Sequence, residues 1–358
     1  MPTLVDFATT GAQFEIPEFE NPTDAISSVK FSPYSNRLLV ASWDKHVYLY
    51  EITSGVGTLV NKFEHRAPVL DVCFGKDDDE AFTCGLDWDI RRLDLTTGTQ
   101  TVLSTHSAPA NRLVYSNARS LLVSTSWDST LHFHSPSADQ NPASLTLPSK
   151  AFSLSLTATK LVVAMASRAL HIYELKNLQL LLSESSATQS AMSTIEAEPW
   201  QRRESSLKYM TRAVACMPND AGYASSSIEG RVAVEWFDPS PDSQARKYAF
   251  KCHRQTENGS DTVYPVHALA FHPVHGTFAS GGGDGIVAIW DAVGKRRIRQ
   301  YHKFPASVAA IDFSTDGKFL AVACSPGFED GKDFVAEGSV SVVIRELGDL
   351  ETQPKAPR

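Results

Sequence analysis

The 358-residue sequence has no run of about 18 consecutive apolar residues and no basic N-terminal segment followed by a long apolar one. We therefore expect a protein that is neither secreted nor membrane-spanning. The five cysteines are scattered and form no Cys-x-x-Cys pair, which is typical of reduced, buried thiols in the cytosol or nucleus.

The sequence also lacks the short motifs of common enzymes and nucleotide-binding proteins. There is no Gly-x-Gly-x-x-Gly after a predicted strand, no Gly-x-x-x-x-Gly-Lys-Ser/Thr, no His-Glu-x-x-His and no Gly-x-Ser-x-Gly. The glycine run 281–285 lacks the Lys-Ser/Thr of a phosphate loop, and the acidic run 77–80 lacks the spacing of an EF-hand. We predict no catalytic activity, no cofactor and no metal ion.

Positive charge is in deficit, because 33 Lys and Arg against 41 Asp and Glu give a formal net charge of -8. This excludes a uniformly cationic coat, so we expect no direct contact with nucleic acid. The segment 201–254 differs, since it holds nine basic residues against six acidic ones. Its cations are either solvated surface charges or a docking site for an acidic or phosphorylated peptide.

One pattern recurs seven times: an alternating strand, a strand of small residues, a tight polar turn and a second alternating strand. The turn acids Asp44, Asp87 and Asp128 are 43 and 41 residues apart, which matches the period of about 40–45 residues of a propeller blade. The pattern predicts an all-β protein, a seven-bladed WD-repeat β-propeller. We expect one domain over 1–358, with blades over roughly 14–350.

Segments outside the repeat complete the predicted ring. The alternating segment 14–16 is predicted to pair beside 340–344 and to close the ring without a long exposed sheet edge. The insertion 182–199, rich in Ser, Ala, Thr and Glu, is predicted to be a mobile loop between the fourth and fifth blades. The segments 255–261 and 326–338 are predicted loops. Residues 351–358 are expected to form a short C-terminal tail.

Two histidines fit the repeat. His65 and His106 each lie 22 residues before a turn acid. We predict that they hydrogen-bond to Asp87 and Asp128 inside the blades, where the polar groups satisfy one another, and that they bind no metal.

Cationic and indole side chains are expected to meet on one face of the ring. Arg212 opens an inner strand, Arg231 follows a hairpin turn and Lys251 ends an outer strand, so we predict that they lie near the same rim. Trp43 and Trp127 hold the same turn position in the first and third blades and should project from that face. Trp and Arg are common interface anchors, although a Trp here can instead shield the blade turn.

Three runs are more specific than a Trp-Asp ending. They are Arg202-Arg203-Glu204-Ser205-Ser206-Leu207-Lys208-Tyr209, Ser227-Ile228-Glu229-Gly230-Arg231-Val232-Ala233-Val234-Glu235 and Tyr248-Ala249-Phe250-Lys251-Cys252-His253-Arg254. With the segment 26–33, they resemble the Bub-type mitotic checkpoint propellers, the small WD-repeat partners of the Bub checkpoint kinases. The resemblance covers nearly the whole chain.

The resemblance implies a non-catalytic adaptor of the spindle checkpoint. Such an adaptor binds a short acidic motif of the checkpoint kinase and its paralogue, and it docks on phosphorylated Met-Glu-Leu-Thr repeats of a kinetochore scaffold. We expect a monomeric propeller that works in hetero-complexes, without membrane contact, in the nucleus and at kinetochores in mitosis. There it would recruit the kinases and support chromosome segregation.

The resemblance also implies site residues. Arg231 and Lys251 are expected to hold the phosphothreonine, with Trp127 at the edge of the peptide groove. Lys251 stands where an Arg can occur, and Lys grips phosphate without a bidentate fork. The residues expected to bind the partner motif are Trp43, Arg202, Arg203, Arg212 and Arg254.

The related messenger-RNA export propellers share versions of 228–233 and 250–254, and they imply a nucleoporin motif as partner. The forms of 204–209 and 234–235 favour the checkpoint branch. A propeller hydrolase would need a catalytic constellation, and none is recognisable in the sequence.

Overall fold

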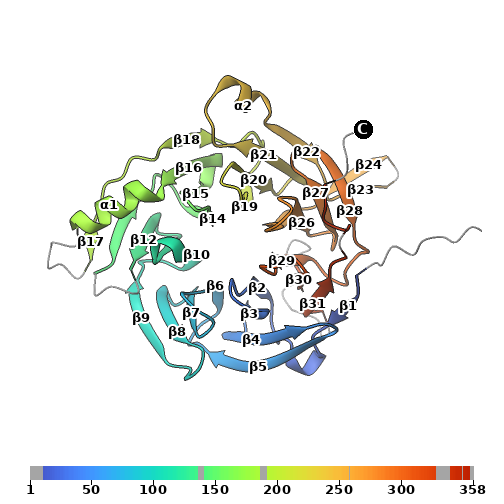
Figure 1. Cartoon of the computed structure of the whole chain (residues 1–358), viewed down its shortest axis with the longest axis horizontal. Helices are drawn as coiled ribbons and strands as arrows, with labels where there is room; N and C mark the ends of the chain where they lie inside the picture. The colour runs from blue at the N-terminus through green and yellow to red at the C-terminus, as the bar shows by residue number, and fades with distance from the viewer. Residues whose placement is uncertain are drawn as a thin grey trace, which may run out of the picture.

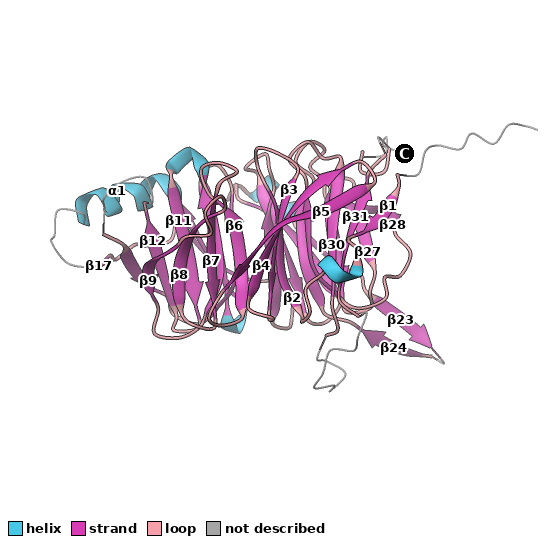
Figure 2. Ribbon diagram, turned by 90° about the horizontal axis from the view of Figure 1, so that it is seen from below, coloured by secondary structure: helices cyan, strands magenta, loops and turns pink. Residues whose placement is uncertain are grey.

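The computed structural model describes residues 11–135, 141–185, 192–257, 259–327, 339–348 and 350–354. Seven sheets stand in a ring, with the first strand of each nearest the centre (Figure 1). Seen from the side, the ring is flat, and a two-stranded hairpin projects from one of its faces (Figure 2). The prediction of a seven-bladed β-propeller is confirmed.

Each blade contains four antiparallel strands, and blade 3 has a fifth, parallel strand in addition. Blade 1 comprises β2 Ile26–Phe31, β3 Arg37–Ser42, β4 His46–Thr53 and β5 Val56–Glu64. Blade 2 comprises β6 Val69–Phe74, β7 Glu80–Gly85, β8 Asp89–Asp94 and β9 Gln100–Thr105. Blade 3 comprises β10 Ala110–Ser116, β11 Leu121–Ser126, β12 Thr130–His134 and β13 Ala143–Thr146. Blade 4 comprises β14 Ala151–Leu156, β15 Lys160–Met165, β16 Ala169–Glu174 and β18 Gln201–Glu204. Blade 5 comprises β19 Thr211–Cys216, β20 Gly222–Ser227, β21 Arg231–Trp236 and β22 Tyr248–Lys251. Blade 6 comprises β25 Val266–Phe271, β26 Phe278–Gly282, β27 Val287–Asp291 and β28 Arg296–Gln300. Blade 7 comprises β29 Val308–Phe313, β30 Phe319–Cys324, β31 Ser341–Glu346 and the N-terminal strand β1 Gln13–Glu15.

Within the described ranges, five short helices lie outside the blade strands. They are the 3-10 turns η1 Glu18–Glu20, η2 Asn117–Arg119 and η3 Ala166–Arg168, and the α-helices α1 Leu175–Ser185 and α2 Pro241–Ala245. Figure 1 places α1 and α2 at the outer rim. In the part of the chain that the structure describes, no helix is long and apolar enough to span a membrane.

The turn acids hold neighbouring segments together. Asp128 accepts hydrogen bonds from the backbone N–H of Thr130 at 2.9 Å and from that of Ser107, 21 residues earlier, at 2.8 Å. Asp44 makes the same two bonds, to His46 at 3.0 Å and to Thr23 at 2.9 Å. The recurring acid thus joins the second hairpin of a blade to the segment that precedes its inner strand.

The predicted histidine–acid pairs are confirmed in one case and wrong in the other. His106 Nδ1 lies 3.2 Å from Asp128 Oδ2. His65 instead contacts the Thr83 hydroxyl, with its Nε2 at 3.0 Å from Oγ1. Asp87 instead forms ion pairs with Arg66 and Arg91, whose guanidinium nitrogens lie 3.0 and 2.8 Å from its Oδ2. The carboxylate therefore has charged partners without the His65 imidazole.

Blade 3 buries a cluster of three histidines. The rings of His106 and His132 are stacked with centroids 3.6 Å apart, and Ser104 Oγ lies 2.9 Å from His132 Nδ1 and 3.2 Å from His134 Nε2. Burial, with the nearby charge of His106, lowers the pKa of both His132 and His134 to about 3.

This cluster predicts loss of stability in mild acid. The two histidines of the unfolded chain take up protons near pH 6.5, whereas those of the folded blade do not. Their contribution to the free energy of unfolding is therefore greatest above pH 6.5 and is lost as the pH falls from 6.5 to about 3. We expect a loss of about 1 kcal/mol per histidine between pH 7.5 and 5.5, measured by urea unfolding at both values. A double variant, His132→Gln with His134→Gln, should show a flatter pH profile; an unchanged profile would refute this origin.

The N-terminal strand closes the ring as predicted. β1 pairs antiparallel with β31, with Gln13 opposite Arg345 and Glu15 opposite Val343. The expected C-terminal tail is wrong for its first residues, because Glu351 and Thr352 are buried, with 3% and 2% exposed. The Glu351 carboxylate binds two arginines of blades 6 and 7. Residues 355–358 lie outside the described residues.

The insertion predicted as a mobile loop has regular structure where it is described. Helix α1 runs to Ser185, and β17 (Ser193–Thr194) adds a parallel fifth strand to β13 of blade 3. Ile195, next to β17, is 6% exposed and packs in the same apolar cluster as Leu178 of α1. The insertion therefore covers the seam between blades 3 and 4, and burial of these apolar side chains explains its order. Residues 186–191 lie outside the described residues.

The predicted loop at 255–261 is a hairpin, formed by β23 (Arg254–Glu257) and β24 (Ser260–Val263). Of the predicted loop at 326–338, residues 328–338 lie outside the described residues.

Candidate functional site

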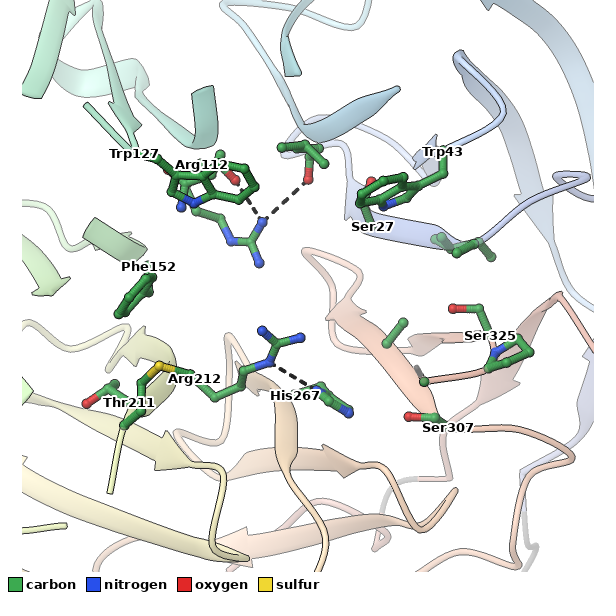
Figure 3. Close-up of a pocket in the computed structure, with 18 residues that line it drawn as sticks. Ser27, Trp43, Arg112, Trp127, Phe152, Thr211, Arg212, His267, Ser307 and Ser325 are labelled. Carbon is green, nitrogen blue, oxygen red and sulfur yellow. Dashed lines mark hydrogen bonds between the residues drawn. The ribbon is translucent and has the colours of Figure 1, made fainter. Parts of the chain in front are cut away.

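A cavity of about 580 Å³ opens at the centre of one face of the ring (Figure 3). All seven blades contribute to its wall. We call this end of the ring, where the inner strands begin, the cavity face.

A β-bulge at the second residue of every inner strand builds this wall. The pairing register between inner and second strand shifts there in each blade. A bulged residue leaves the regular ladder and re-aims its side chain. All seven bulged residues line the cavity, and they are Ser27, Leu70, Asn111, Phe152, Arg212, His267 and Ala309.

The two turn tryptophans, which were expected to project from one face of the ring, both border the cavity. The backbone N–H of Trp43 donates to Ala25 O at 2.9 Å, and that of Trp127 donates to Pro109 O at 3.1 Å, so the two turns have the same local structure. Trp43 is 38% exposed and Trp127 37% exposed, and both line the cavity. Their indoles therefore offer apolar surface to a bound chain, whether or not they also shield the turns beneath them.

The ionisable side chains of the cavity wall are basic. Arg212 Nε donates a hydrogen bond to His267 Nδ1 at 3.1 Å, and Arg112 Nη1 donates to Asn111 O at 2.8 Å and to Leu70 O at 3.4 Å. Figure 3 shows the two guanidinium groups entering the cavity from opposite walls. Among the described residues that line it, there is no Asp or Glu. A cationic cavity with aromatic walls suits an acidic peptide.

A second group of cations lies on blade 5. Arg231, the first residue of β21, pairs directly with Lys251, the last residue of β22, so both side chains leave the same side of the sheet. Arg254 Nη2 donates to the backbone oxygen of Glu229 at 3.1 Å. We call Arg231, Lys251 and Arg254 the rim cluster.

The turn before Arg231 places the rim cluster. Gly230 has φ +64°, and a Cβ there would meet the carbonyl oxygen of Cys252 at 2.7 Å, so glycine is required. Glu229 Oε2 lies 3.6 Å from Arg231 Nε, and its Oε1 accepts the N–H of Lys208 at 3.3 Å. Because this turn is the equivalent of the Trp43 and Trp127 turns, the rim cluster lies on the cavity face.

Comparisons with known proteins agree with this architecture. The family model for "WD domain, G-beta repeat" matches residues 15–51, 98–135 and 250–291. The chain is 43% identical over 339 residues to mitotic checkpoint protein BUB3.1 of Arabidopsis thaliana, covering 93% of each chain. It is 36% identical to mitotic checkpoint protein bub3 of Dictyostelium discoideum, covering 87% of this chain and 88% of the other, and 35% identical to spindle assembly checkpoint protein bub3 of Schizosaccharomyces pombe, covering 85% and 89%. This chain belongs to the Bub3 family.

Membership of the Bub3 family supports a role in the mitotic checkpoint, and it confirms the resemblance found in the sequence. These relatives therefore favour the checkpoint branch over the messenger-RNA export branch. Bub3-family proteins are WD-repeat proteins of a non-catalytic kind.

The structure brings together most of the site residues predicted for this Bub3-family chain. Trp43, Trp127 and Arg212 line the cavity. Arg231 and Lys251 are adjacent in the rim cluster with Arg254, two blades away from Trp127. The pair predicted to bind phosphate and the tryptophan thus share a face, but they do not share a cavity.

Two predicted residues lie elsewhere. Arg202 and Arg203 are on β18, the outer strand of blade 4. Arg203 is a structural link between blades, because its guanidinium donates to Phe237 O at 3.1 Å and lies 3.5 Å from Glu235 Oε2, with only 12% of the side chain exposed. Arg202 is 60% exposed and pairs with Glu198. Neither residue lines the cavity or joins the rim cluster.

Sequence reasoning missed several cavity residues, foremost Arg112, His267 and Phe152. His267 and Phe152 hold the same bulge position as Arg212 in their own blades. Aligning the seven repeats at that position is the signal that finds them.

Proposed function

We propose that this protein is a checkpoint adaptor that holds two partners on its cavity face. A short acidic motif of a checkpoint kinase, or of its paralogue, lies across the cavity. A phosphorylated Met-Glu-Leu-Thr repeat of a kinetochore scaffold binds at the rim cluster. The adaptor thereby recruits the kinase to kinetochores from a nuclear pool and supports chromosome segregation, without catalysis of its own.

The cavity supports the first contact by its chemistry. Trp43 and Trp127 supply apolar surface, and Arg112 and Arg212 supply charge from opposite walls. Aromatic and arginine side chains are the usual sources of binding energy in such an interface. The absence of acids among the described lining residues means that a carboxylate entering the cavity meets only cations and neutral groups.

The cross-strand pair of Arg231 and Lys251 is the observation that carries the second contact. Two cations held side by side on the same side of a sheet match a group with nearly two negative charges and three acceptor oxygens. Arg231 provides the planar donor fork, and Lys251 provides a point charge. Arg254 extends the positive field beside them.

Titration of one scaffold repeat in two forms tests this function. We expect the threonine-phosphorylated peptide to bind at least about tenfold more tightly than the unphosphorylated peptide, because a charge-assisted hydrogen bond contributes about 1.5–3 kcal/mol. Isothermal titration calorimetry at fixed salt measures both. Equal affinities would remove the phosphate-reading claim. Recovery of nuclear-pore proteins in place of checkpoint kinases from a mitotic extract would favour the export function.

A further inference from the structure

The rim cluster carries its own counter-ions. Glu229 Oε2 lies 3.6 Å from Arg231 Nε, and Asp261 Oδ2 lies 3.6 Å from Arg254 Nη1. Two of the three cations therefore already face a carboxylate before any ligand binds. A phosphate that enters the cluster must compete with these carboxylates or settle beside them.

Glu229 is fixed in place. It occupies the turn position that Asp44 and Asp128 hold in blades 1 and 3, and like them it accepts a backbone N–H from the residue 21 positions earlier, here Lys208. Its side chain is 15% exposed. This carboxylate is part of the turn that precedes β21 and is more buried than Asp261.

Asp261 is held far more loosely. It lies on β24 of the hairpin that projects from the ring (Figure 2), and its side chain is 49% exposed. All four residues of β24 are exposed to solvent. Besides Arg254, the hydroxyl of Thr256 contacts Asp261 from directly across the hairpin and donates a hydrogen bond to its Oδ1 at 2.6 Å.

We propose that Asp261 is a displaceable counter-ion of the rim cluster, which neutralises part of its charge in the free protein and so lowers its affinity for phosphate. The inference rests on the proposed phosphate-binding function and deepens it. A phosphopeptide takes over the interactions of Arg254 and Lys251, and Asp261 then leaves towards solvent on its hairpin. Ligands with a single negative charge gain less from this exchange than a phosphate with nearly two.

The electrostatics of Asp261 agree with this placement. The hydrogen bond from Thr256 lowers the pKa of Asp261 most, and the charges of Arg254 and Lys251 lower it further. The carboxylate is therefore ionised at neutral pH and lies within the field of both cations.

Asp261→Asn tests the proposal without disturbing the hairpin, because the asparagine oxygen still accepts the Thr256 hydroxyl. We expect the phosphorylated scaffold peptide to bind about two- to fivefold more tightly at about 50 mM salt, and the gain to shrink at about 0.5 M salt as screening increases. Asp242→Asn is the matched control, since Asp242 is exposed on α2 at the opposite end of blade 5 and its loss changes the net charge equally.

The outcomes are distinct. An unchanged affinity in Asp261→Asn, or an equal gain in Asp242→Asn, overturns the proposal while leaving the phosphate-binding function intact, provided that the wild-type protein prefers the phosphorylated peptide. If the wild-type protein shows no such preference, the function and the proposal fall together. A gain confined to Asp261→Asn and to the phosphorylated peptide supports both.

Discussion

Arg231→Ala is expected to weaken binding of the phosphorylated scaffold peptide by about tenfold or more and to leave binding of the unphosphorylated peptide unchanged. The guanidinium donates charge-assisted hydrogen bonds, each worth about 1.5–3 kcal/mol, which the alanine cannot replace. The melting temperature should shift by less than about 2 °C, because the ion pair with Glu229 is long and 36% of the Arg231 side chain is exposed.

Calorimetric titration with both peptides and thermal unfolding of each variant measure these effects. Arg202→Ala is the matched control, since it removes an exposed cation from the outer strand of blade 4, outside the rim cluster. A similar loss in Arg202→Ala would point to a general charge effect. A loss shared by the two peptides would show that Arg231 does not read phosphate.

Glu351→Ala is expected to lower the free energy of unfolding by about 3 kcal/mol. Its carboxylate, 3% exposed, lies 2.8 Å from both Arg345 Nη2 and Arg299 Nη1, and it also accepts the Tyr301 hydroxyl at 3.2 Å. The backbone N–H of Gly11 donates to the same carboxylate at 3.3 Å. Loss of the acid leaves Arg345, 10% exposed on its side chain, without its counter-charge at the seam where the ring closes.

Urea unfolding at pH 7.5 measures this effect. Glu351→Gln keeps the acceptor oxygen and should lose less stability than Glu351→Ala. Glu184→Ala, on the exposed face of α1, should lose almost none. An unchanged unfolding midpoint in Glu351→Ala would show that the C-terminal segment does not hold the ring together. Binding of either peptide should persist in the folded fraction, because Glu351 neither lines the cavity nor belongs to the rim cluster.

The ring was predictable because its cause is periodic. Alternation of period two appears in the sequence, and the acids of the blade turns recur at a nearly constant spacing, so strand pairs and their turns follow directly. The structure of the insertion 182–199 was not predictable, because its composition is rich in Ser and Glu and its few apolar residues show no clear pattern. Leu178 and Ile195 become buried only because blade 3 lies beside them, and that proximity is a property of the ring.

The site was predictable in part for a similar reason. Arg231 and Lys251 were expected near one rim, and they pair across β21 and β22 because strand ends map onto one face of a propeller. Arg212, expected at the same rim, lines the central cavity instead. Arg203 was misplaced because composition reports the charge of a segment but gives no side-chain direction, and on β18 the side chain turns to blade 5. Arg112 was missed because a register shift at the preceding residue cannot be recognised from alternation alone.

The bulged position of each inner strand carries the side chains that shape the cavity. The seven side chains at these positions line the cavity, while the ladders on either side of each bulge keep their pairing. Ser27 and Asn111 also bond to the next blade, at Val69 O and Ala151 O, so exchanges there would cost stability. Exchanges at Phe152 or Ala309 would change the cavity surface with less effect on the scaffold, so the cavity can diverge between duplicated copies of such a gene at some blades more readily than at others. A designer who wishes to retarget this ring should keep Ser27 and Asn111 and vary Arg212 together with His267, because these two side chains are hydrogen-bonded to each other.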